Sequence, residues 1–410
     1  MKTVDPVPLR HPDAPRRVPG LRPFALLLGL RAPRSTQWDA LGAALVVGDG
    51  PMDELVDWMY REGMAATRPL FERALRSGID SVPEAPEPLR EFFVRVETPP
   101  PWLDRDKIAR AERVFQLGGA DGLYIARDVS FLGGYLASGF NKTLLRTGAL
   151  EKGPAKRFAE TLQWALDVTS DGGMAPGGRG FRSTVQVRFI HAMVRRHVSA
   201  MPDWQADRWG LPINQTDMAA TLVGALIAPF AGGLALGLVA TPRDLDAAAH
   251  LTRYVGWLIG VEDRLLPTGF RDGVRILYHS LAAITDPDET TRQLAVPMAD
   301  DPLHWHYPNL AWLRGRIARA QHLSVAGVFL GPAAMRHLGL PRFTLPWYPL
   351  LRIPVNLAAC VLARALPGGM ARAAARGRRA QEAFLRRLIG ADSARIGGSA
   401  QHIGHATGRH

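Results

Sequence analysis

The sequence predicts an all-α protein that folds as a single large helical domain. Apolar residues recur at helical spacing along almost the whole chain. The alternation of apolar and polar residues that marks strands is nearly absent, and no Asn-Gly hairpin signal occurs. With 410 residues, of which 47% are hydrophobic, the chain can bury a substantial core.

Composition divides the chain into three parts. Residues 1–35 contain seven prolines and no periodicity, so we expect an extended N-terminal arm. Residues 36–345 carry the helical pattern, and we place the core of this domain at about 104–290. Residues 346–410 hold an apolar segment and then a basic tail, which we expect to be frayed.

Proline- and glycine-rich connections set the limits of the predicted helices. In the first part of the chain they are 37–47, two helices within 51–78, a short helix at about 88–94, 104–126 with a break at Gly118–Gly119, the glycine-spaced segment 131–147, and 154–170. The later ones are 181–200, 241–265, 272–285, 289–298, and 309–338 with a break at Gly331–Pro332.

The segment 221–240 has 20 residues without a charge, a length that fits a membrane span. Pro229, Gly232, Gly233 and Gly237 interrupt it, so we favour a buried core helix with a kink. The alternative is a membrane-associated helical protein, with 221–240 and 344–366 as its anchors. Association with a membrane surface therefore stays open at this point.

The helix predicted at 181–200 is the most informative one. Val187, Ile190, Val194 and Val198 share one helical face, and His191 lies at the edge of that face. Imidazole is a common ligand of metals and of haem iron. A lone histidine on an apolar face is more often a hydrogen-bonded core residue, so the pattern alone does not decide between the two.

The preceding helix places Arg157 and Thr161 four residues apart, on one face. If both side chains face the core, they need polar partners there. The alternative is an exposed arginine beside a threonine that bonds to its own helix backbone.

Charge and cysteine content exclude several classes of function. The net charge is +12, but the arginines are spread along the chain and no nucleic-acid motif occurs, so we expect no nucleic-acid partner. The single cysteine, Cys360, excludes an intrachain disulfide, a cysteine-based zinc site and C-x-x-C-H haem attachment, and we expect it to be buried. We find no export signal, so we expect a cytoplasmic protein.

Other motifs are weak or absent. The sequence has no H-E-x-x-H zinc motif, no Glu-x-x-His pair of a di-iron bundle and no G-x-S-x-G nucleophile motif. His304 and His306 are two residues apart beside a proline, which favours loop structure over metal binding. The glycines at 177–180 lack the Lys-Ser/Thr of a P-loop, so phosphate binding is not indicated.

The block Arg157-x-x-x-Thr161, followed 30 residues later by His191 within VRFIHAMVRR, resembles the haem-containing rubber oxygenases, or latex clearing proteins. It also resembles the wider MpaB-like oxygenase family to which they belong. The flanking sequences TGALEKGPAKRFAET, WGLPINQTDMAATLVGALIAPF and LTRYVGWLIGVEDRLLP agree with this likeness. The resemblance runs from about residue 110 to residue 290.

The resemblance implies an all-α fold with a globin-like haem-binding core. His191 would be the proximal axial ligand of a non-covalently bound b-type haem, with Arg157 and Thr161 near the haem on its distal side. The implied chemistry is oxidative: dioxygen attacks a carbon–carbon double bond of the substrate and leaves an aldehyde and a ketone.

Two positions depart from the rubber oxygenases. These enzymes can carry a lysine directly before the threonine, and here that position is Glu160. They are also thought to use a distal glutamate as a base, and a gapless alignment places Asn141 there. Asparagine cannot take up a proton at neutral pH, so Glu160 is the candidate substitute if burial raises its pKa.

We therefore predict a haem b-dependent oxygenase or dioxygenase for an apolar unsaturated substrate, a polyisoprene-, isoprenoid- or lipid-like small molecule or polymer. Arg157, Thr161 and Glu160 are the candidate catalytic residues, and dioxygen is the second substrate. Two alternatives remain open: a haem peroxidase or peroxygenase, and a haem-binding protein without turnover.

Overall fold

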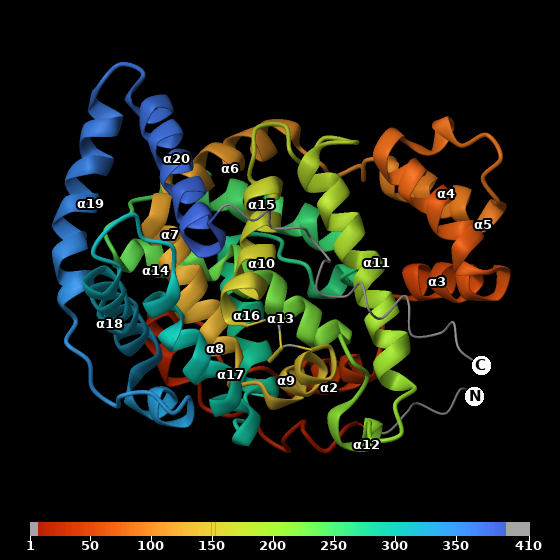
Figure 1. The fold of residues 1–410 in the computed structure, drawn as a ribbon, viewed down its shortest axis with the longest axis horizontal. Coiled ribbons are helices and arrows are strands. Elements are labelled where there is room, and N and C mark those ends of the chain that lie inside the picture. The colour runs from red at the N-terminus through yellow and green to blue at the C-terminus, as the bar shows by residue number, and fades with distance from the viewer. Residues whose placement is uncertain (1–6, 149, 152, 391–410) are drawn as a thin grey trace.

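The computed structural model describes residues 7–148, 150–151 and 153–390, and in these residues the chain is all-helical, as the sequence predicts (Figure 1). Strand-like pairing in these residues is limited to an isolated β-bridge between Ala137 and Asp286. The helices of the first half are α1 (Arg22–Leu27), α2 (Ser35–Ala43), α3 (Gly50–Glu62), α4 (Met64–Ser77), α5 (Glu87–Glu97), α6 (Arg105–Leu117), α7 (Gly119–Ile125), α8 (Leu132–Gly134), α9 (Ser138–Arg146), α10 (Pro154–Val168) and α11 (Arg179–Ser199).

The second half continues the same architecture. Its helices are α12 (Ala206–Trp209), α13 (Gln215–Leu226), α14 (Ala228–Ala235), α15 (Pro242–Ile259), α16 (Phe270–Ile284), α17 (Glu289–Asp300), α18 (Ala311–His337), α19 (Trp347–Ala365) and α20 (Gly369–Ile389). The breaks predicted at Gly118–Gly119 and at Gly331 are both present, the second as a non-helical kink inside α18.

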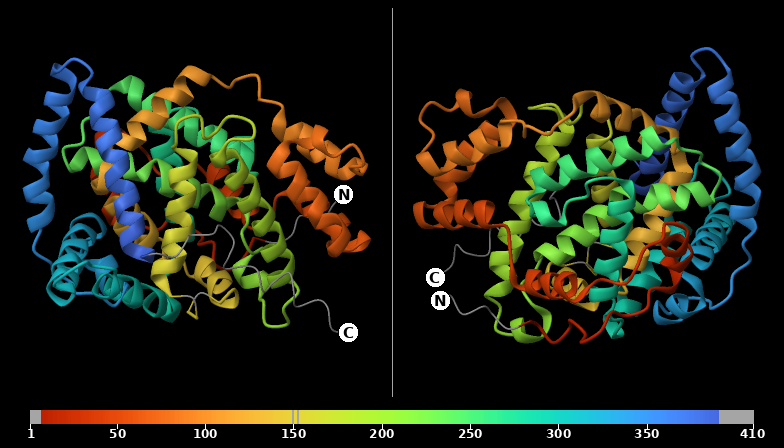
Figure 2. Two further views of the ribbon diagram at one scale, coloured as in Figure 1. Left: turned by 45° about the horizontal axis from the view of Figure 1, so that its top comes forward. Right: turned by 180° about the vertical axis from the view of Figure 1, so that it is seen from behind.

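The helices form a central body with a smaller group at each end (Figures 1 and 2). Helices α10, α13, α15 and α16 lie in the body, and α11 crosses one side of it. Helices α3, α4 and α5 form a lobe beyond α11, whereas α19 and α20 form a hairpin at the opposite end.

Two clusters of buried side chains make up most of the core. The larger one joins the α3–α5 lobe to the body, for example where Phe71 of α4 stacks on Phe189 of α11 with ring centroids 4.5 Å apart. The smaller one lies under α17, α18 and α20, and Phe384 packs there against Tyr124 and Trp305. Burial of these apolar faces is the main stabilising term of the fold.

A buried polar network ties the second cluster together. The π-helical segment Ala126–Phe131 (η4) carries Arg127, whose side chain is fully buried. Its Nη1 donates to Asp128 over 2.7 Å, and its Nη2 faces the Met298 carbonyl and Asp301. His322 of α18 completes the network, with its Nδ1 2.6 Å from Asp128.

The structure differs from the sequence expectations at both ends. The arm contains two short helical pieces, Pro19–Leu21 and α1. Residues 369–389, expected to belong to a frayed tail, form α20 instead, because Phe384 and Leu388 are buried in the second cluster. The remainder of the expected tail, 391–410, lies outside the described residues. Cys360, expected to be buried, is only half-buried.

The uncharged segment forms a broken helix in the core. Within the described residues, only Gln215–Ala235 is long and apolar enough to cross a membrane, and 56% of its apolar 18-residue stretch is buried inside the protein. Helix α13 ends at Leu226 and α14 begins at Ala228, just before Pro229. Helix α13 packs against α15 and α16, an arrangement that agrees with the kinked core helix favoured from the sequence.

We expect Arg127→Ala to lower the free energy of unfolding by about 3–5 kcal/mol, because it leaves buried carboxylates without a counter-charge. Arg314→Ala removes an exposed arginine of α18 and serves as the control, with an expected change within about 0.5 kcal/mol. Thermal and denaturant unfolding measure the stability of both variants. Equal stability of the two variants would contradict this assignment.

Candidate functional site

Helix α11 is held rigidly on both sides of His191. One turn before it, Arg188 donates to both carboxylate oxygens of Asp49, over 2.6 and 2.7 Å, and to the Leu258 carbonyl. One turn after it, Arg195 pairs with Asp53 and donates to the Ile213 carbonyl. Both arginines are buried, so rotating α11 would leave buried charges unpaired.

His191 itself has an unsatisfied ring nitrogen. Its side chain is half-buried, but its Nδ1 atom is fully buried and has no hydrogen-bond partner. Burial lowers the pKa of the imidazole to about 3, and the positive charge of Arg195 acts in the same direction. The ring is therefore neutral at physiological pH, which is the form that binds metal ions. The Nδ1 atom thus lacks the hydrogen bond that a core histidine usually makes.

Helix α10 places Arg157 and Thr161 one turn apart, as predicted. Arg157 is half-buried, and its Nη1 lies 3.5 Å from the Tyr135 hydroxyl, which it can reach as a donor. Its guanidinium also lies 5.8 Å from the centre of the Phe131 ring. The Thr161 hydroxyl donates to the Arg157 carbonyl over 3.4 Å. The threonine thus bonds to its own helix backbone, as the alternative interpretation allowed. The arginine is half-buried beside Tyr135, which differs from the exposed position in that interpretation.

Tyr135 links this group to Asn141. Asn141 is fully buried, and its amide donates to the Tyr135 carbonyl over 2.8 Å and to the Thr290 hydroxyl over 3.2 Å. Burial raises the pKa of the Tyr135 hydroxyl, and the Arg157 guanidinium opposes part of that rise. Tyr135 was not among the site residues predicted from the sequence. The aromatic residue within the glycine-spaced segment FLGGYLASGF is the signal that could have indicated it.

The two helices that carry the predicted site residues pack against each other. Trp164 of α10 donates its indole N–H to Thr184 of α11 over 3.1 Å, and this bond fixes their register. Arg157, Thr161 and the half-buried Glu160 are thus on one helix, with His191 on its neighbour. Over the residues that the structure describes, no group of three or more His, Cys, Asp or Glu side chains could chelate a metal ion.

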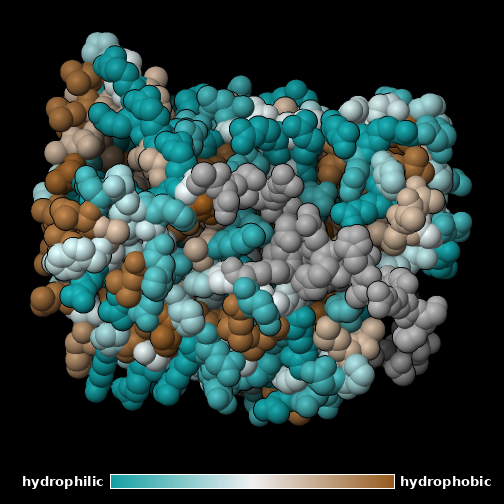
Figure 3. All heavy atoms as spheres, in the orientation of Figure 1, coloured by the Kyte–Doolittle hydropathy of each residue, from teal (hydrophilic) through white to brown (hydrophobic). Residues whose placement is uncertain are grey.

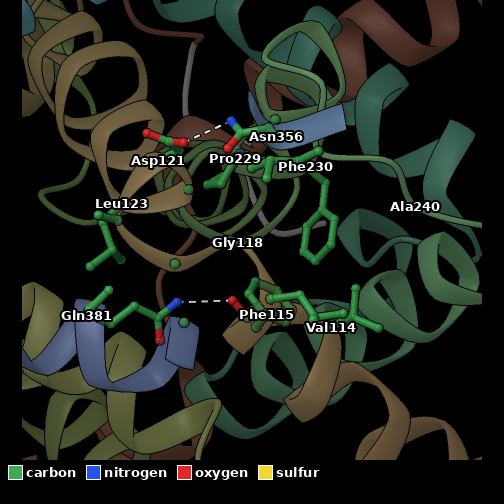
Figure 4. Close-up of a pocket in the computed structure, with 18 of the residues that line it drawn as sticks. Val114, Phe115, Gly118, Asp121, Leu123, Pro229, Phe230, Ala240, Asn356 and Gln381 are labelled. Atoms are coloured by element: carbon green, nitrogen blue, oxygen red, sulfur yellow. Dashed lines mark hydrogen bonds between the residues drawn. The ribbon is translucent and has the colours of Figure 1, made fainter. Parts of the chain in front are cut away.

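A separate cavity of about 470 Å³ lies between α6, α7, α14, α19 and α20 (Figure 4). Its walls are mostly apolar, with Phe115, Leu123 and Phe230 among them. The buried Asp121 provides a polar point, where it accepts hydrogen bonds from Tyr348, Arg352 and Asn356. The cavity also touches α10, at Ala165, Leu166 and Thr169.

We expect Asn141→Asp to destabilise the fold by about 2 kcal/mol or more, because it removes two donated hydrogen bonds and buries a carboxylate. The exposed Asn309 undergoes the same chemical change in Asn309→Asp, and this control should melt like the unmodified chain. Melting temperatures followed by circular dichroism compare them. If both variants melt together, Asn141 has no structural role.

The comparisons with known proteins point to one family. Residues 120–365 match the family model described as "ER-bound oxygenase mpaB/B'/Rubber oxygenase, catalytic domain". The chain is 25% identical over 187 residues to the rubber oxygenase of Streptomyces sp. (strain K30). That match covers 44% of this chain and 45% of the relative, so it spans less than half of the relative's length.

A solved structure extends the likeness to the fold. The latex clearing protein LCP in its closed state superimposes with a TM-score of 0.63 at 19% identity. The superposition covers 83% of this chain and 91% of that one, so the all-helical architecture is shared over most of both chains. Together with the family match over more than half of the sequence, this places the chain: it belongs to the mpaB and rubber oxygenase catalytic-domain family.

Proposed function

We propose that the chain is a haem b-dependent oxygenase that uses dioxygen to cleave a carbon–carbon double bond in an apolar substrate. The observation that carries the proposal is the buried, unpartnered Nδ1 of His191, on a helix that two ion pairs hold in place. Family membership supplies the reaction class, oxygenation.

The residues present fit a haem group. A haem iron needs only one protein imidazole on its proximal side, so a single neutral histidine is a sufficient donor set. With a single half-buried cysteine and no C-x-x-C-H motif, the binding would be non-covalent. When bound, the haem would supply the iron chemistry by which dioxygen oxidises the double bond to two carbonyl groups.

The chain's own polar groups on α10 would act on the bound dioxygen and substrate. Arg157, already directed toward the Tyr135 hydroxyl, would place a positive charge and hydrogen-bond donors beside the reacting oxygen atoms. Thr161 would contribute its hydroxyl one turn further along. Glu160 is the carboxylate in this group and would hold or accept a proton, a role that the Asn141 amide cannot perform.

An apolar substrate suits the surroundings of α10. The cavity of about 470 Å³ reaches Ala165, one helical turn beyond Thr161, and apolar side chains dominate its walls. The relative from Streptomyces is named a rubber oxygenase. We therefore propose an unsaturated polyisoprene-, isoprenoid- or lipid-like substrate, and we leave chain length to experiment.

One observation favours a second candidate, a haem-binding protein without turnover. Asn141 replaces the glutamate expected from the resemblance, and its amide is committed to Tyr135 and Thr290. Incubation with an unsaturated test substrate under dioxygen, and separately with hydrogen peroxide, separates three outcomes. Carbonyl products with dioxygen support the oxygenase, products only with peroxide indicate a peroxygenase, and no product indicates a protein without turnover.

His191→Ala should greatly weaken the Soret band of the purified or hemin-loaded protein, because it removes the imidazole that would hold the haem iron. His197→Ala changes a half-buried histidine nearly two turns later on the same helix, and this control should keep the band. Absorption spectra of the oxidised and reduced proteins measure both. Full pigment in the His191 variant would show that another residue binds the iron.

Arg157→Ala should keep most of the haem but lower turnover about tenfold or more, because it removes a donor directed at developing charge. The exposed neighbour Lys156 provides the control variant Lys156→Ala, whose turnover should not change. Dioxygen consumption and carbonyl products, normalised to bound haem, report the result. Unchanged turnover in Arg157→Ala would remove this residue from the proposed site.

A further inference from the structure

Helix α19 is amphipathic, but its polar face is turned toward the protein and its apolar face toward the outside. Its polar side chains point into the protein: Asn356 is buried and Arg352 is half-buried, and both donate to the carboxylate of Asp121. Asn356 also donates to the Leu236 carbonyl. A surface helix of a water-soluble protein normally turns its apolar face inward. Here the inward face is the one that carries the polar groups.

The outward face of α19 is apolar instead. Seven of its hydrophobic side chains are 37–64% exposed. They are Leu350, Leu351, Ile353, Val355, Leu357, Val361 and Leu362. The chain before the helix adds Phe343 and Leu345, which are 75% and 79% exposed, and Trp347 at the start of the helix. We call these ten residues the α19 face.

The space-filling view shows hydrophobic side chains gathered along the edge of the molecule where α19 lies (Figure 3). Scattered exposed hydrophobic residues are normal on a protein surface, but a contiguous patch marks an interaction site. Aromatic residues at one end of a long aliphatic face are typical of helices that lie in a membrane interface.

The charge around the α19 face is mainly positive. The acidic Asp300 lies near Phe343 and Trp347, but it is paired with Arg319. From Pro302 to Gln381 the sequence contains 11 arginines and no aspartate or glutamate. Exposed arginines lie just before α19 and on α20, its partner in the hairpin. They are Arg342, Arg372, Arg376 and Arg379. Such an apolar face with a basic rim is complementary to a bilayer that carries anionic lipid headgroups.

We propose that the α19 face binds the surface of an anionic lipid bilayer, with α19 lying in the plane of the interface. The helix does not cross the membrane, because its inner side stays bonded to Asp121 and to the Leu236 carbonyl. A second copy of the chain is a poorer occupant. A symmetric pair would bring two arginine-rich rims together, and like charges across an interface repel.

This position has a consequence for the cavity. The inner side of α19 forms part of the cavity wall, through Asn356, Ala359, Cys360 and Ala363. A bilayer on the outer side therefore lies only one helix away from an apolar space inside the protein. The surface binding itself does not depend on the oxygenase activity, so it can be tested whether or not the protein contains haem.

The test is co-sedimentation of the full chain with lipid vesicles. We expect binding to vesicles of phosphatidylcholine and phosphatidylserine in a two-to-one ratio. Binding to pure phosphatidylcholine vesicles should be about tenfold weaker or more. Added salt should weaken binding to the phosphatidylserine-containing vesicles, because it screens the charges of the arginines. Retention on both vesicle types alike would show that the basic rim has no role and would overturn the proposal in this form.

The double variant Leu351→Asp, Leu362→Asp should bind anionic vesicles about tenfold less or worse, because it places two carboxylates on the apolar face. Both leucines are 58% exposed, so the fold and the melting temperature should not change. Val94→Asp is the control: Val94 is 50% exposed on α5, in the lobe at the opposite end of the molecule. This variant should bind like the unmodified chain.

Three further results would also overturn the proposal. The unmodified chain could fail to bind either vesicle, or the double variant could bind as well as the unmodified chain. The third is a concentration-dependent dimer, seen by light scattering, which the double variant dissociates while vesicles capture nothing. That result would assign the α19 face to a second copy of the chain.

Discussion

Two arginine–aspartate ion pairs, one buried and one half-buried, hold α11, and the position of His191 depends on both of them. Arg188 and Arg195 lie on either side of the histidine, and their carboxylate partners, Asp49 and Asp53, both lie at the start of α3. Removing these charges from water is favourable only while each one keeps its partner. The same contacts attach the α3–α5 lobe to the body, so the lobe and the candidate site are coupled.

The chemistry proposed at the site follows from this rigidity. A neutral imidazole whose buried nitrogen lacks a partner is costly in a folded protein unless another group satisfies it. On the neighbouring helix, Arg157 is directed by the buried Tyr135, whose carbonyl is in turn bound by Asn141. The site therefore combines an unpartnered imidazole nitrogen on one helix with a hydrogen-bonded polar group on the other.

Much of the helical architecture could be predicted from the chain, because periodicity and helix breakers are local signals. The helix predicted at 181–200 is α11 at Arg179–Ser199, and the glycine breaks occur where expected. Helix α20 was missed because its arginine-rich sequence looks solvated until aromatic side chains of α7, α10 and α18 pack around Phe384. Tyr135 was missed because its partners, Arg157 and Asn141, come from separate helices.

The sequence by itself determined the fold class, the helix that carries His191, the pair Arg157 and Thr161, and the family likeness, since each depends on residues close together in the chain. Only the tertiary structure decided which side of each helix faces the protein. It turned the polar side of α19 inward, because Asp121 of α7, distant in sequence, needed the hydrogen bonds of Arg352 and Asn356. A buried carboxylate requires such partners, and that requirement leaves the leucines of the α19 face outside.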